Sequence, residues 1–419
     1  MNISNKGKAA LIGGKLGHSY SPMLHALYGA PYTYELCELT PEALGDFVAE
    51  GLYDGFNVTI PYKKAIIPYL SGLSEIAERL GSVNTVYKTE NGYVGDNTDY
   101  YGFAYTVSHS GISVAGKKAM VLGNGGVSPT VVAVLSDMEA REIKVISIEE
   151  NTPEILAQHA DTEILVNATP VGMYPNVGVS PCSLSHFPRL CAVYDLVYNP
   201  FETAIMHAAR MRGVAAFGGI AMLAAQAKRA MELFLHIEIP SERIAEVTKT
   251  VVTEKRNVIL IGMPGCGKST LGEALAKEMG KRFVDLDAEI VKTAGKPISE
   301  IFAEEGEEAF RRYEHEVVKR ACKESGLVIA TGGGVVTREE NLAPMQQNGI
   351  VVFLDRATEK LPTSGRPLSQ AKSPAVLYRE RLPLYRAAAD TTVDNNGTPD
   401  VALAALVHAA KTKKTTRGI

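Results

Sequence analysis

The segment GMPGCGKST, residues 262–270, has the residue types and the spacing that bind phosphate groups. It follows the apolar run 258–261 and opens a stretch with Leu271, Leu275 and Met279 at helical spacing. In a GxxxxGK[ST] turn, backbone N–H groups surround the phosphates, the lysine reaches the β- and γ-phosphates, and the hydroxyl binds Mg²⁺. The pattern therefore predicts a P-loop for ATP, formed by Pro264, Gly265, Cys266, Gly267, Lys268, Ser269 and Thr270.

A second glycine-rich turn, GNGG at residues 123–126, joins the apolar run 119–122 to a helical pattern. Glycines at such a turn let a pyrophosphate approach the backbone and the N-terminus of the next helix. A GxGG turn alone is as often an ordinary tight connection. Here the next apolar run, 143–148, follows at the spacing of a βαβ unit, which favours a dinucleotide site.

Four polar segments precede GNGG and stand at predicted strand ends and turns. They are GHSYSP (17–22), NVTIPYK (57–63), SVNTV (82–86) and GDNTDYYG (95–102). Packing alone does not require these polar residues. Since binding residues of open α/β sheets collect on loops at the carboxyl edge of the strands, we interpret the segments as a substrate site.

The elements that position these motifs are short apolar runs that alternate with turns and helical patterns, which is typical of parallel α/β sheets. The runs of the first half are 9–12, 56–60, 119–122, 143–148, 164–166 and 192–196. Residues 218–236 predict one long helix that closes the first unit. A chain of 419 residues exceeds one ordinary core. The polar stretch 239–257, with Ser241 as a helix cap, places the boundary near residue 254.

Composition excludes several classes of protein. With 46% hydrophobic and 21% charged residues the chain fits a soluble globular protein, and a net charge of −4 without a long basic run argues against nucleic-acid binding. The five cysteines form no CxxC pair and the nine histidines no ligand-spaced cluster, which argues against disulfides and zinc. No window of about 18 apolar residues predicts a membrane span. We expect a cytoplasmic protein.

The first-half segments, followed by NATPVGM (167–173) and YDLVYNP (194–200), resemble the shikimate dehydrogenase family over about residues 8–250. The resemblance implies that Lys63 and Asp99 are the catalytic pair. A lysine ammonium would stabilise the charge that hydride transfer develops on a ketone oxygen and would supply a proton, while the aspartate orients it. An isolated lysine is usually a solvated surface residue, but the TIPYK frame favours the catalytic role.

The resemblance also implies the binding residues of this half. Shikimate would contact Ser19 and Ser21 through its carboxylate, with Tyr198 nearby, and Thr59, Asn84, Asp99 and Gln226 through its ring hydroxyls. The dinucleotide would contact Gly123, Asn124, Gly125, Gly126, Val127, Leu196 and Gly219.

One position departs from the family pattern. The strand after the glycine turn usually ends in Asn-Arg-Thr, whose arginine pairs with the 2′-phosphate of NADP, whereas Ser147, Ile148 and Glu149 stand here and Pro129 replaces a frequent basic residue. A carboxylate would repel a phosphate but can accept hydrogen bonds from a ribose diol. The family habit is NADP, and NAD stays open as the alternative.

The second half resembles shikimate kinases over about residues 255–410. The P-loop is followed in order by DLD (285–287), FRRYE (310–314), TGGG (331–334), GRPL (365–368) and RLPLY (381–385). The resemblance implies that Asp287 binds the ring hydroxyls and accepts the proton of the attacking one. Asp285 would act with Ser269 through Mg²⁺.

Further roles follow from the same resemblance. Arg311 and Arg381 would clamp the shikimate carboxylate, a planar bidentate contact that suits arginine. Gly333 would let the backbone approach the substrate, and Arg366 would reach the γ-phosphate from a mobile lid. The segment 354–366 is shorter than the common lid and lacks a clear arginine beside the adenine, and Gly397 stands where many members place a nucleotide-contacting side chain.

The sequence as a whole predicts an α/β protein with two enzymes in tandem. Residues 1–253 would form a shikimate dehydrogenase, with a substrate domain from about 1–100 and 218–240 and a Rossmann dinucleotide domain from about 101–217. Residues 254–419 would form a P-loop kinase. The expected reactions are reduction of 3-dehydroshikimate with NAD(P)H and phosphorylation of shikimate with ATP and Mg²⁺. A first half that acts on quinate or is degenerate is the rival, and the oligomeric state is not set by the sequence.

Overall fold

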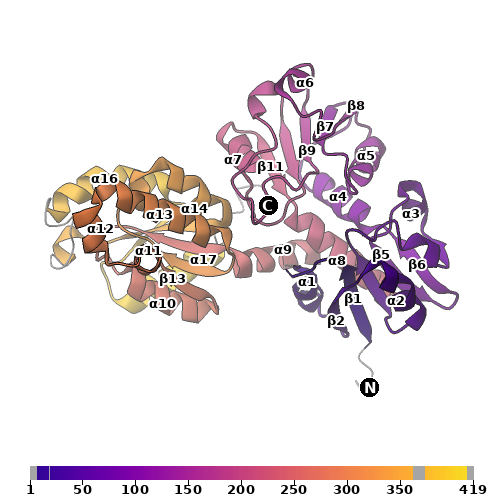
Figure 1. The fold of residues 1–419 in the computed structure, drawn as a ribbon, viewed down its shortest axis with the longest axis horizontal. Helices are drawn as coiled ribbons and strands as arrows, with labels where there is room; N and C mark the ends of the chain where they lie inside the picture. Colours follow the sequence, from indigo (N-terminus) through magenta and orange to yellow (C-terminus); the bar gives the residue numbers. More distant parts are fainter. Residues whose placement is uncertain (1–6, 18, 362–372, 413–419) are drawn as a thin grey trace.

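The computed structural model describes residues 7–17, 19–361 and 373–412, which form three α/β units in series (Figure 1). Each unit is built around one sheet, and the three sheets have six, five and five strands. The predicted fold class, α/β with a Rossmann-like sheet and a P-loop domain, is confirmed. Among the described residues, no helix is both long and apolar enough to cross a membrane.

The first sheet is mixed and holds the N-terminal strand second from one edge. Its strands, in spatial order, are β2 (Thr33–Glu38), β1 (Lys8–Gly13), β3 (Gly55–Val58), β5 (Thr85–Thr89), β6 (Gly92–Asp96) and β4 (Gly72–Leu73). The helices α1 (Ser21–Leu27), α2 (Leu44–Glu50) and α3 (Glu75–Leu80) belong to this lobe. Strand β1 pairs in parallel with β2 and β3, whereas β5 runs antiparallel to both of its neighbours.

The second sheet is parallel throughout, in the order β11 (Ala215–Gly218), β10 (Ala192–Asp195), β9 (Ile164–Asn167), β7 (Lys118–Leu122) and β8 (Glu142–Ile146). Its helices are α5 (Ser128–Asp137), α6 (Pro153–Ala157) and α7 (Ala204–Met211). Strand β7 is buried along its whole length, as a continuous apolar run in a parallel sheet should be. The chain leaves β7 toward β8 on one side and later returns to β9 on the other. The GNGG turn after β7 therefore lies at the topological switch point, where open sheets bind ligands.

Two helices, α4 (Thr98–Ser108) and α8 (Ile220–Leu235), pack against each other between the first two sheets (Figure 1). The approach is close at Gly102, where a Cβ atom would lie 2.6 Å from the Met222 carbonyl oxygen. Phe234 at the other end of α8 fills the space beside Gly55 of β3, where any side chain would collide with its ring. Most buried residues of α8 thus pack in the core of the first lobe, and Met222 packs in that of the second sheet.

The third sheet is also parallel, in the order β13 (Arg282–Asp285), β14 (Leu327–Ala330), β12 (Asn257–Ile261), β15 (Gly349–Asp355) and β16 (Thr391–Asp394). Its helices are α10 (Lys268–Met279), α11 (Leu286–Ala294), α12 (Ile298–Glu304), α13 (Gly306–Lys323), α14 (Leu342–Asn348), α16 (Pro374–Ala388) and α17 (Pro399–Thr412). The P-loop follows β12 in the middle of this sheet and leads into α10.

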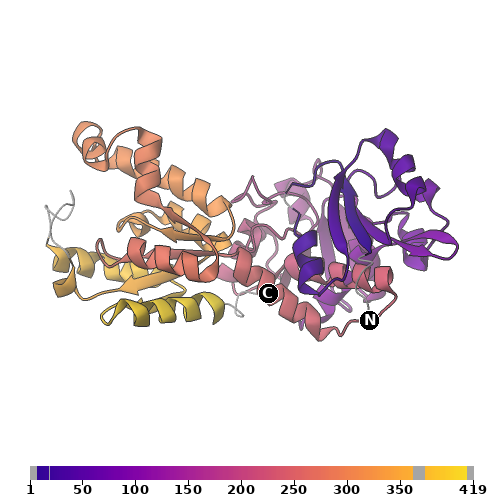
Figure 2. The ribbon, with the colours of Figure 1, turned by 90° about the horizontal axis from the view of Figure 1, so that it is seen from below.

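Helix α9 (Glu242–Lys255) connects the first lobe to the third sheet, as the two views in Figures 1 and 2 show. Its apolar residues Ile244, Val247 and Val251 lie in the core of the first lobe, and β12 begins two residues after the helix ends. The polar stretch 239–257 is therefore largely helical. Ser241 stands at the N-cap position of α9, as expected, but its side chain makes no capping hydrogen bond, and the predicted boundary near 254 falls in the last turn of the helix.

The predicted strands are present with small shifts at their ends. The runs 56–60, 143–148 and 192–196 were each expected to extend further than β3, β8 and β10 do. The polar residues Thr59 and Ser147 follow β3 and β8, whereas β10 ends at Asp195, whose carboxylate accepts a hydrogen bond from the Val197 amide. The single helix expected over 218–236 begins at Ile220, because Ala215–Gly218 pairs with β10 as strand β11.

Candidate active sites

The predicted catalytic pair of the first half is formed. The Lys63 ammonium donates to the Asp99 carboxylate at 2.6 Å, and the side chains are 20% and 8% exposed. Lys63 stands in the turn after β3, and its carbonyl oxygen accepts a hydrogen bond from the Val83 amide. Asp99 lies in the first turn of α4. The pair is therefore held between two elements of the same lobe and is only partly screened by water.

Asn84 fixes the start of α4 and with it the position of Asp99. Its side-chain oxygen accepts hydrogen bonds from the Thr98 amide at 2.7 Å and from the Thr98 hydroxyl at 3.2 Å. The Thr98 hydroxyl also lies 2.9 Å from that of Thr85. Because the oxygen is engaged, the amide nitrogen of Asn84 is the group that can contact a ring hydroxyl. Gln226 of α8 lies beside Gly102, one turn along α4 from Asp99.

The two serines of the SxS motif are close together at the start of α1. The Ser19 hydroxyl donates to that of Ser21 at 3.2 Å and also accepts from the Ser21 amide at 3.2 Å. Between them Tyr20 packs on Tyr198, with ring centroids 5.2 Å apart. Burial raises the pKa of both tyrosines, so both stay neutral. The predicted carboxylate-binding residues thus form one group.

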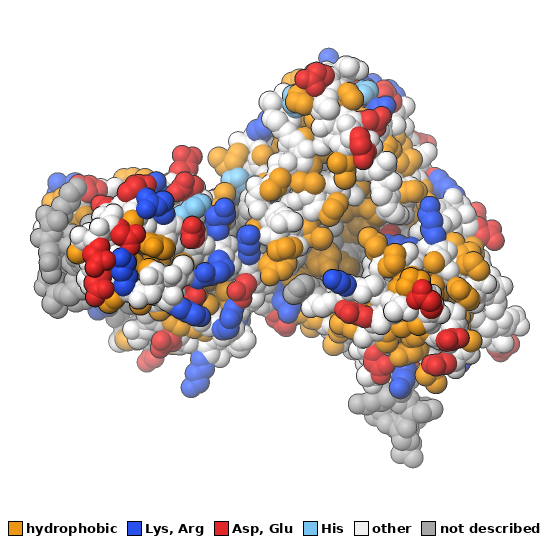
Figure 3. Space-filling model, viewed as in Figure 1, with side chains coloured by type: hydrophobic (Ala, Val, Ile, Leu, Met, Phe, Trp, Pro, Cys, Tyr) orange, Lys and Arg blue, Asp and Glu red, His pale blue; other side chains and the backbone are white. Residues whose placement is uncertain are grey.

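Thr59 ends the β3 segment, and its amide donates to the Ile12 carbonyl of β1. Thr59 and the serine group belong to the lobe of the first sheet, whereas Tyr198 comes from the loop after β10 of the second sheet. The predicted site residues therefore come from both lobes. Figure 3 shows a hollow in the molecular surface between these lobes.

The GNGG turn has the geometry of a phosphate-binding turn. Gly123 has a φ of 99°, and a Cβ there would lie 2.8 Å from Thr169. Added Cβ atoms at Gly125 and Gly126 would meet no described atom within 4 Å, so these positions are open to a ligand. Val127 immediately precedes α5, and Asn124 is exposed.

Leu196 and Gly219, the other predicted dinucleotide contacts, lie together: a Cβ at Gly219 would collide with the Leu196 carbonyl oxygen. The loop that carries Leu196 is fixed by Asp195, a residue that the sequence analysis missed. Its carboxylate accepts from Asn167 and the Val197 amide, each at 3.0 Å, and from Thr203 at 2.5 Å. Burial raises the pKa of Asp195 to about 6.

The end of β8, where a 2′-phosphate of NADP would lie, carries carboxylates. The Ser147 amide donates to the Glu150 carboxylate at 3.1 Å, and Ile148 and Glu149 are exposed. Backbone hydrogen bonds lower the pKa of Glu149 and Glu150, so both are ionised at neutral pH. The local charge at this strand end is negative.

The P-loop of the third sheet is compact around its lysine. The Lys268 ammonium, 7% exposed, donates to the carbonyl oxygens of Gly262 at 2.9 Å and Met263 at 3.0 Å. Gly267 has a φ of 98° and directly precedes α10. The remaining predicted residues Pro264, Gly265, Cys266, Ser269 and Thr270 complete the loop and the first turn of the helix.

Ser269 and Asp285 fit a magnesium ion. The Ser269 hydroxyl donates to the Asp285 carboxylate at 2.6 Å, which places two hard oxygen donors side by side at the end of β13. Among the described residues no cluster of three His, Cys, Asp or Glu side chains could hold a metal ion. Mg²⁺ is usually bound through one or two protein oxygens together with phosphates and water, so the Ser269 and Asp285 oxygens would suffice to hold it.

The predicted acceptor residues converge on the glycines of TGGG. A Cβ at Gly332 would lie 3.0 Å from the Asp287 carboxylate, and a Cβ at Gly333 would lie 2.5 Å from Pro264 of the P-loop. The Gly333 carbonyl accepts from Arg381 at 3.2 Å and from the Tyr385 hydroxyl. Side chains at these glycines would therefore close the space between Asp287 and the P-loop.

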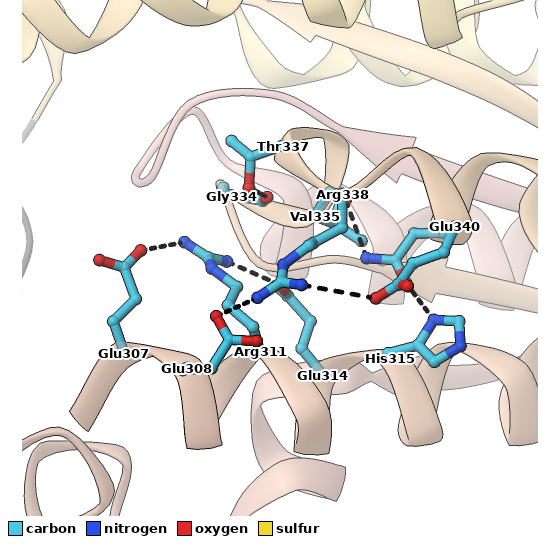
Figure 4. A network of polar contacts seen from close by, with 12 residues as sticks. Glu307, Glu308, Arg311, Glu314, His315, Gly334, Val335, Thr337, Arg338 and Glu340 are labelled. Atoms are coloured by element: carbon cyan, nitrogen blue, oxygen red, sulfur yellow. Dashed lines mark hydrogen bonds and ion pairs between the residues drawn. The ribbon is translucent and has the colours of Figure 1, made fainter. Parts of the chain in front are cut away.

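Arg311 is held on α13 by two acidic residues, as Figure 4 shows. It donates to Glu314 at 2.7 Å and to Glu307 at 3.1 Å, and a side chain at Gly334 would collide with its guanidinium group. Glu314 is 1% exposed, and burial raises its pKa. Its second oxygen has no hydrogen-bond partner among the described residues and faces Gly332. Arg311 and Glu314 stand three residues apart in FRRYE, which places them on the same face of a helix. This spacing is the sequence signal that could have identified Glu314 as the partner of Arg311.

Two further residues near the nucleotide site were also missed. Arg356, inside the segment that was expected to lack such an arginine, comes within 4.0 Å of a Cβ added to Gly267. Its Nε is buried and without a partner in the described part of the chain. Asn395 donates to the Cys266 carbonyl at 2.6 Å, whereas Gly397 is exposed with open space around it. Arg366 lies outside the described residues.

These features define two classes of protein in one chain: a two-lobed oxidoreductase with a dinucleotide-type sheet, and a P-loop kinase with an acceptor site of carboxylates and arginines. Residues 11–86 match the family model of the shikimate dehydrogenase substrate binding domain, and residues 264–411 match that of shikimate kinase. Over 274 residues the chain is 34% identical to the shikimate dehydrogenase (NADP(+)) of Thermosynechococcus vestitus, covering 58% of this chain and 96% of the relative.

Solved structures match the dehydrogenase part of the chain. A chorismate mutase/shikimate 5-dehydrogenase fusion protein from Clostridium acetobutylicum is 34% identical with a TM-score of 0.56, covering 59% of this chain and 97% of that one. Shikimate 5-dehydrogenase from Thermus thermophilus, in complex with NADP(H) and shikimate, is 30% identical with a TM-score of 0.52, covering 58% and 98%. The chain belongs to the shikimate dehydrogenase family and carries a shikimate kinase domain in its C-terminal part.

Proposed function

We propose that this chain is a bifunctional shikimate-pathway enzyme that reduces 3-dehydroshikimate to shikimate and then phosphorylates the 3-hydroxyl of shikimate. The observation that carries the proposal is the contact of Lys63 with Asp99 in a chain that also holds a complete P-loop and its acceptor residues. The two reactions are consecutive, because the reduction creates the hydroxyl that the kinase uses. NADP and ATP are the cosubstrates that the family relationships support.

In the dehydrogenase half, the reduced nicotinamide supplies a hydride to the carbonyl carbon of the substrate. Ser19 and Ser21 bind the carboxylate, and Asn84 and Gln226 hold ring hydroxyls. As the carbon accepts the hydride, the carbonyl oxygen becomes an alkoxide, and the Lys63 ammonium stabilises its charge and gives it a proton. The Asp99 carboxylate keeps Lys63 oriented, and solvent restores the proton afterwards. Partial burial of the pair strengthens this stabilisation, since fewer water dipoles screen it.

In the kinase half, Asp287 accepts the proton of the 3-hydroxyl while the oxygen attacks the γ-phosphorus and the bond to the β-phosphate oxygen breaks. Lys268 neutralises the phosphate charge, and Arg311 with Arg381 orients the shikimate carboxylate. Ser269 and Asp285 would hold Mg²⁺, which supplies further charge neutralisation. Glu314 keeps Arg311 in place beside Gly334, and Arg356 would contact the nucleotide.

A coupled assay of the purified full chain tests the proposal. Dehydroshikimate is added with NADPH or NADH while nicotinamide absorbance is followed, and ATP is then added and 3-phosphoshikimate is detected by mass spectrometry. Both products should form. Lys268→Ala should remove only 3-phosphoshikimate, whereas Lys63→Met should remove both products unless shikimate is supplied. More efficient reduction of 3-dehydroquinate in a parallel assay, or formation of only one product, would support the rival assignment.

A further inference from the structure

Tyr20 connects the dehydrogenase substrate site to the kinase half. It stands between Ser19 and Ser21, is 8% exposed, and packs its ring against Tyr198. The Lys255 ammonium, at the end of α9, lies 5.6 Å from the centroid of the same ring. The hydroxyl group of Tyr20 is buried and makes no hydrogen bond among the described residues, although Ser325 of the kinase half lies near enough to offset part of the rise in the Tyr20 pKa that burial causes.

Lys255 and Ser325 are both fixed within the kinase half. The Gly326 amide, directly after Ser325, donates to the Lys255 carbonyl at 2.6 Å. The Lys281 ammonium donates to the carbonyl oxygens on either side of Lys255, those of Glu254 at 2.5 Å and Arg256 at 2.8 Å. The Ser325 hydroxyl accepts from Asn348 at 3.3 Å. The backbone around Lys255 is therefore bonded to the kinase half, while the rest of α9 packs in the dehydrogenase core.

The kinase half also contacts the dinucleotide lobe. The Glu202 amide, just before α7, donates to the Gln347 carbonyl of α14 at 2.9 Å. Beside this contact lies a cavity of about 410 Å³, lined by Val179 and Pro200 on one side and by Lys319 and Gln347 on the other. The two halves are thus not closely packed throughout. Direct contacts such as those at Tyr20 and Glu202 fix their relative position.

We propose that the kinase half positions the carboxylate-binding segment of the dehydrogenase through Tyr20, with Lys255 holding its ring against Tyr198. The inference deepens the function proposed above and rests on it. A cation over an aromatic face restricts the rotation of Tyr20, and the two neighbouring serines share its backbone. Tyr20 and Lys255 are positioning residues, since they act through Ser19 and Ser21.

Steady-state kinetics of the full chain test the proposal. Lys255→Met keeps the methylene chain and the backbone bond to Gly326 while removing the charge over Tyr20. We expect the KM for shikimate in the dehydrogenase direction to rise about three- to tenfold, the range that loss of one cation–π contact produces. The dehydrogenase kcat, the KM for the dinucleotide and the kinase constants should stay at parental values. Lys255→Arg should restore the parental KM.

A double-mutant cycle shows whether the effect passes through Tyr20. In a Tyr20→Leu background, Lys255→Met should have no further effect on the KM for shikimate, because the ring it acts on is absent. Lys249→Met, an exposed lysine on the same helix, is the matched control and should leave every constant unchanged.

Reduction of dehydroshikimate by the parental protein tests the dehydrogenase part of the proposed function independently of these variants. A parental rate with an unchanged KM in Lys255→Met overturns the inference alone. So does a rise of the same size in the Tyr20→Leu background, because Lys255 would then act on the substrate directly.

Discussion

Replacing Lys63 by methionine tests the chemistry of the dehydrogenase half most directly. Methionine keeps much of the length and volume of lysine but removes the ammonium group that contacts Asp99 at 2.6 Å. The reacting oxygen would then develop its charge without a cation or a proton donor. Loss of a positioned acid or charge usually lowers turnover about 10²- to 10⁴-fold, or about 3–5 kcal/mol of transition-state stabilisation.

The assay follows reduction of dehydroshikimate and, in the same preparation, phosphorylation of shikimate. The Lys63→Met variant should lose the first activity and keep the second, since no described contact links Lys63 to the third sheet. Lys64→Met, its exposed neighbour, controls for loss of a surface charge and should be unaffected. Near-parental reduction by Lys63→Met would refute the catalytic assignment, and loss of both activities would point to a folding defect, which circular dichroism would detect.

Further predictions concern the cofactor, the kinase and pH. The ratio of kcat/KM for NADP to that for NAD should be smaller than in relatives that keep the arginine, because the Glu149 carboxylate would repel the 2′-phosphate. A strong preference for NADP would mean that another cation reaches this phosphate. A fragment that begins at Lys255 should fold and phosphorylate shikimate, and Lys268→Ala or Asp287→Asn in it should abolish turnover without changing its circular dichroism. Because burial raises the pKa of Asp195 to about 6 from 3.8, the folded state binds a proton before the unfolded chain does. The free energy of unfolding of the dehydrogenase half should therefore rise as pH falls through this interval, by at most about 3 kcal/mol, and Asp195→Asn should remove the rise in thermal unfolding curves.

The motifs that could be predicted from the sequence are those whose residues are contiguous. The P-loop and GNGG turns were located because strand, turn and helix follow one another within about twenty residues, and the glycine φ values agree with the turns that their spacing implied. The pairing of Lys63 with Asp99 joins separate segments. It was expected from the resemblance, and the structure brings the two side chains together.

Residues whose roles depend on distant partners were missed. Asp195 matters because Asn167 and Thr203 converge on it, and Arg356 matters because β15 brings it beside the P-loop. The YDLVYNP motif contains Asp195 but does not indicate its partners, and nothing in the local sequence marks Arg356, since an arginine in a loop is usually solvated. The packing of Lys255 on Tyr20 joins residues 235 positions apart and follows only from the path of α9.

The position of α9 determines which contacts each half keeps when the chain is divided. The proposed halves, 1–253 and 254–419, separate within the last turn of a helix whose apolar face lies in the dehydrogenase core. A kinase fragment that begins at Lys255 keeps the carbonyl group that binds Gly326 and one of the two that bind Lys281. A dehydrogenase fragment that ends at 253 keeps the apolar residues of α9 but loses the cation over Tyr20. The first fragment should therefore retain its activity, whereas the second should fold and reduce dehydroshikimate with a weakened hold on the substrate carboxylate.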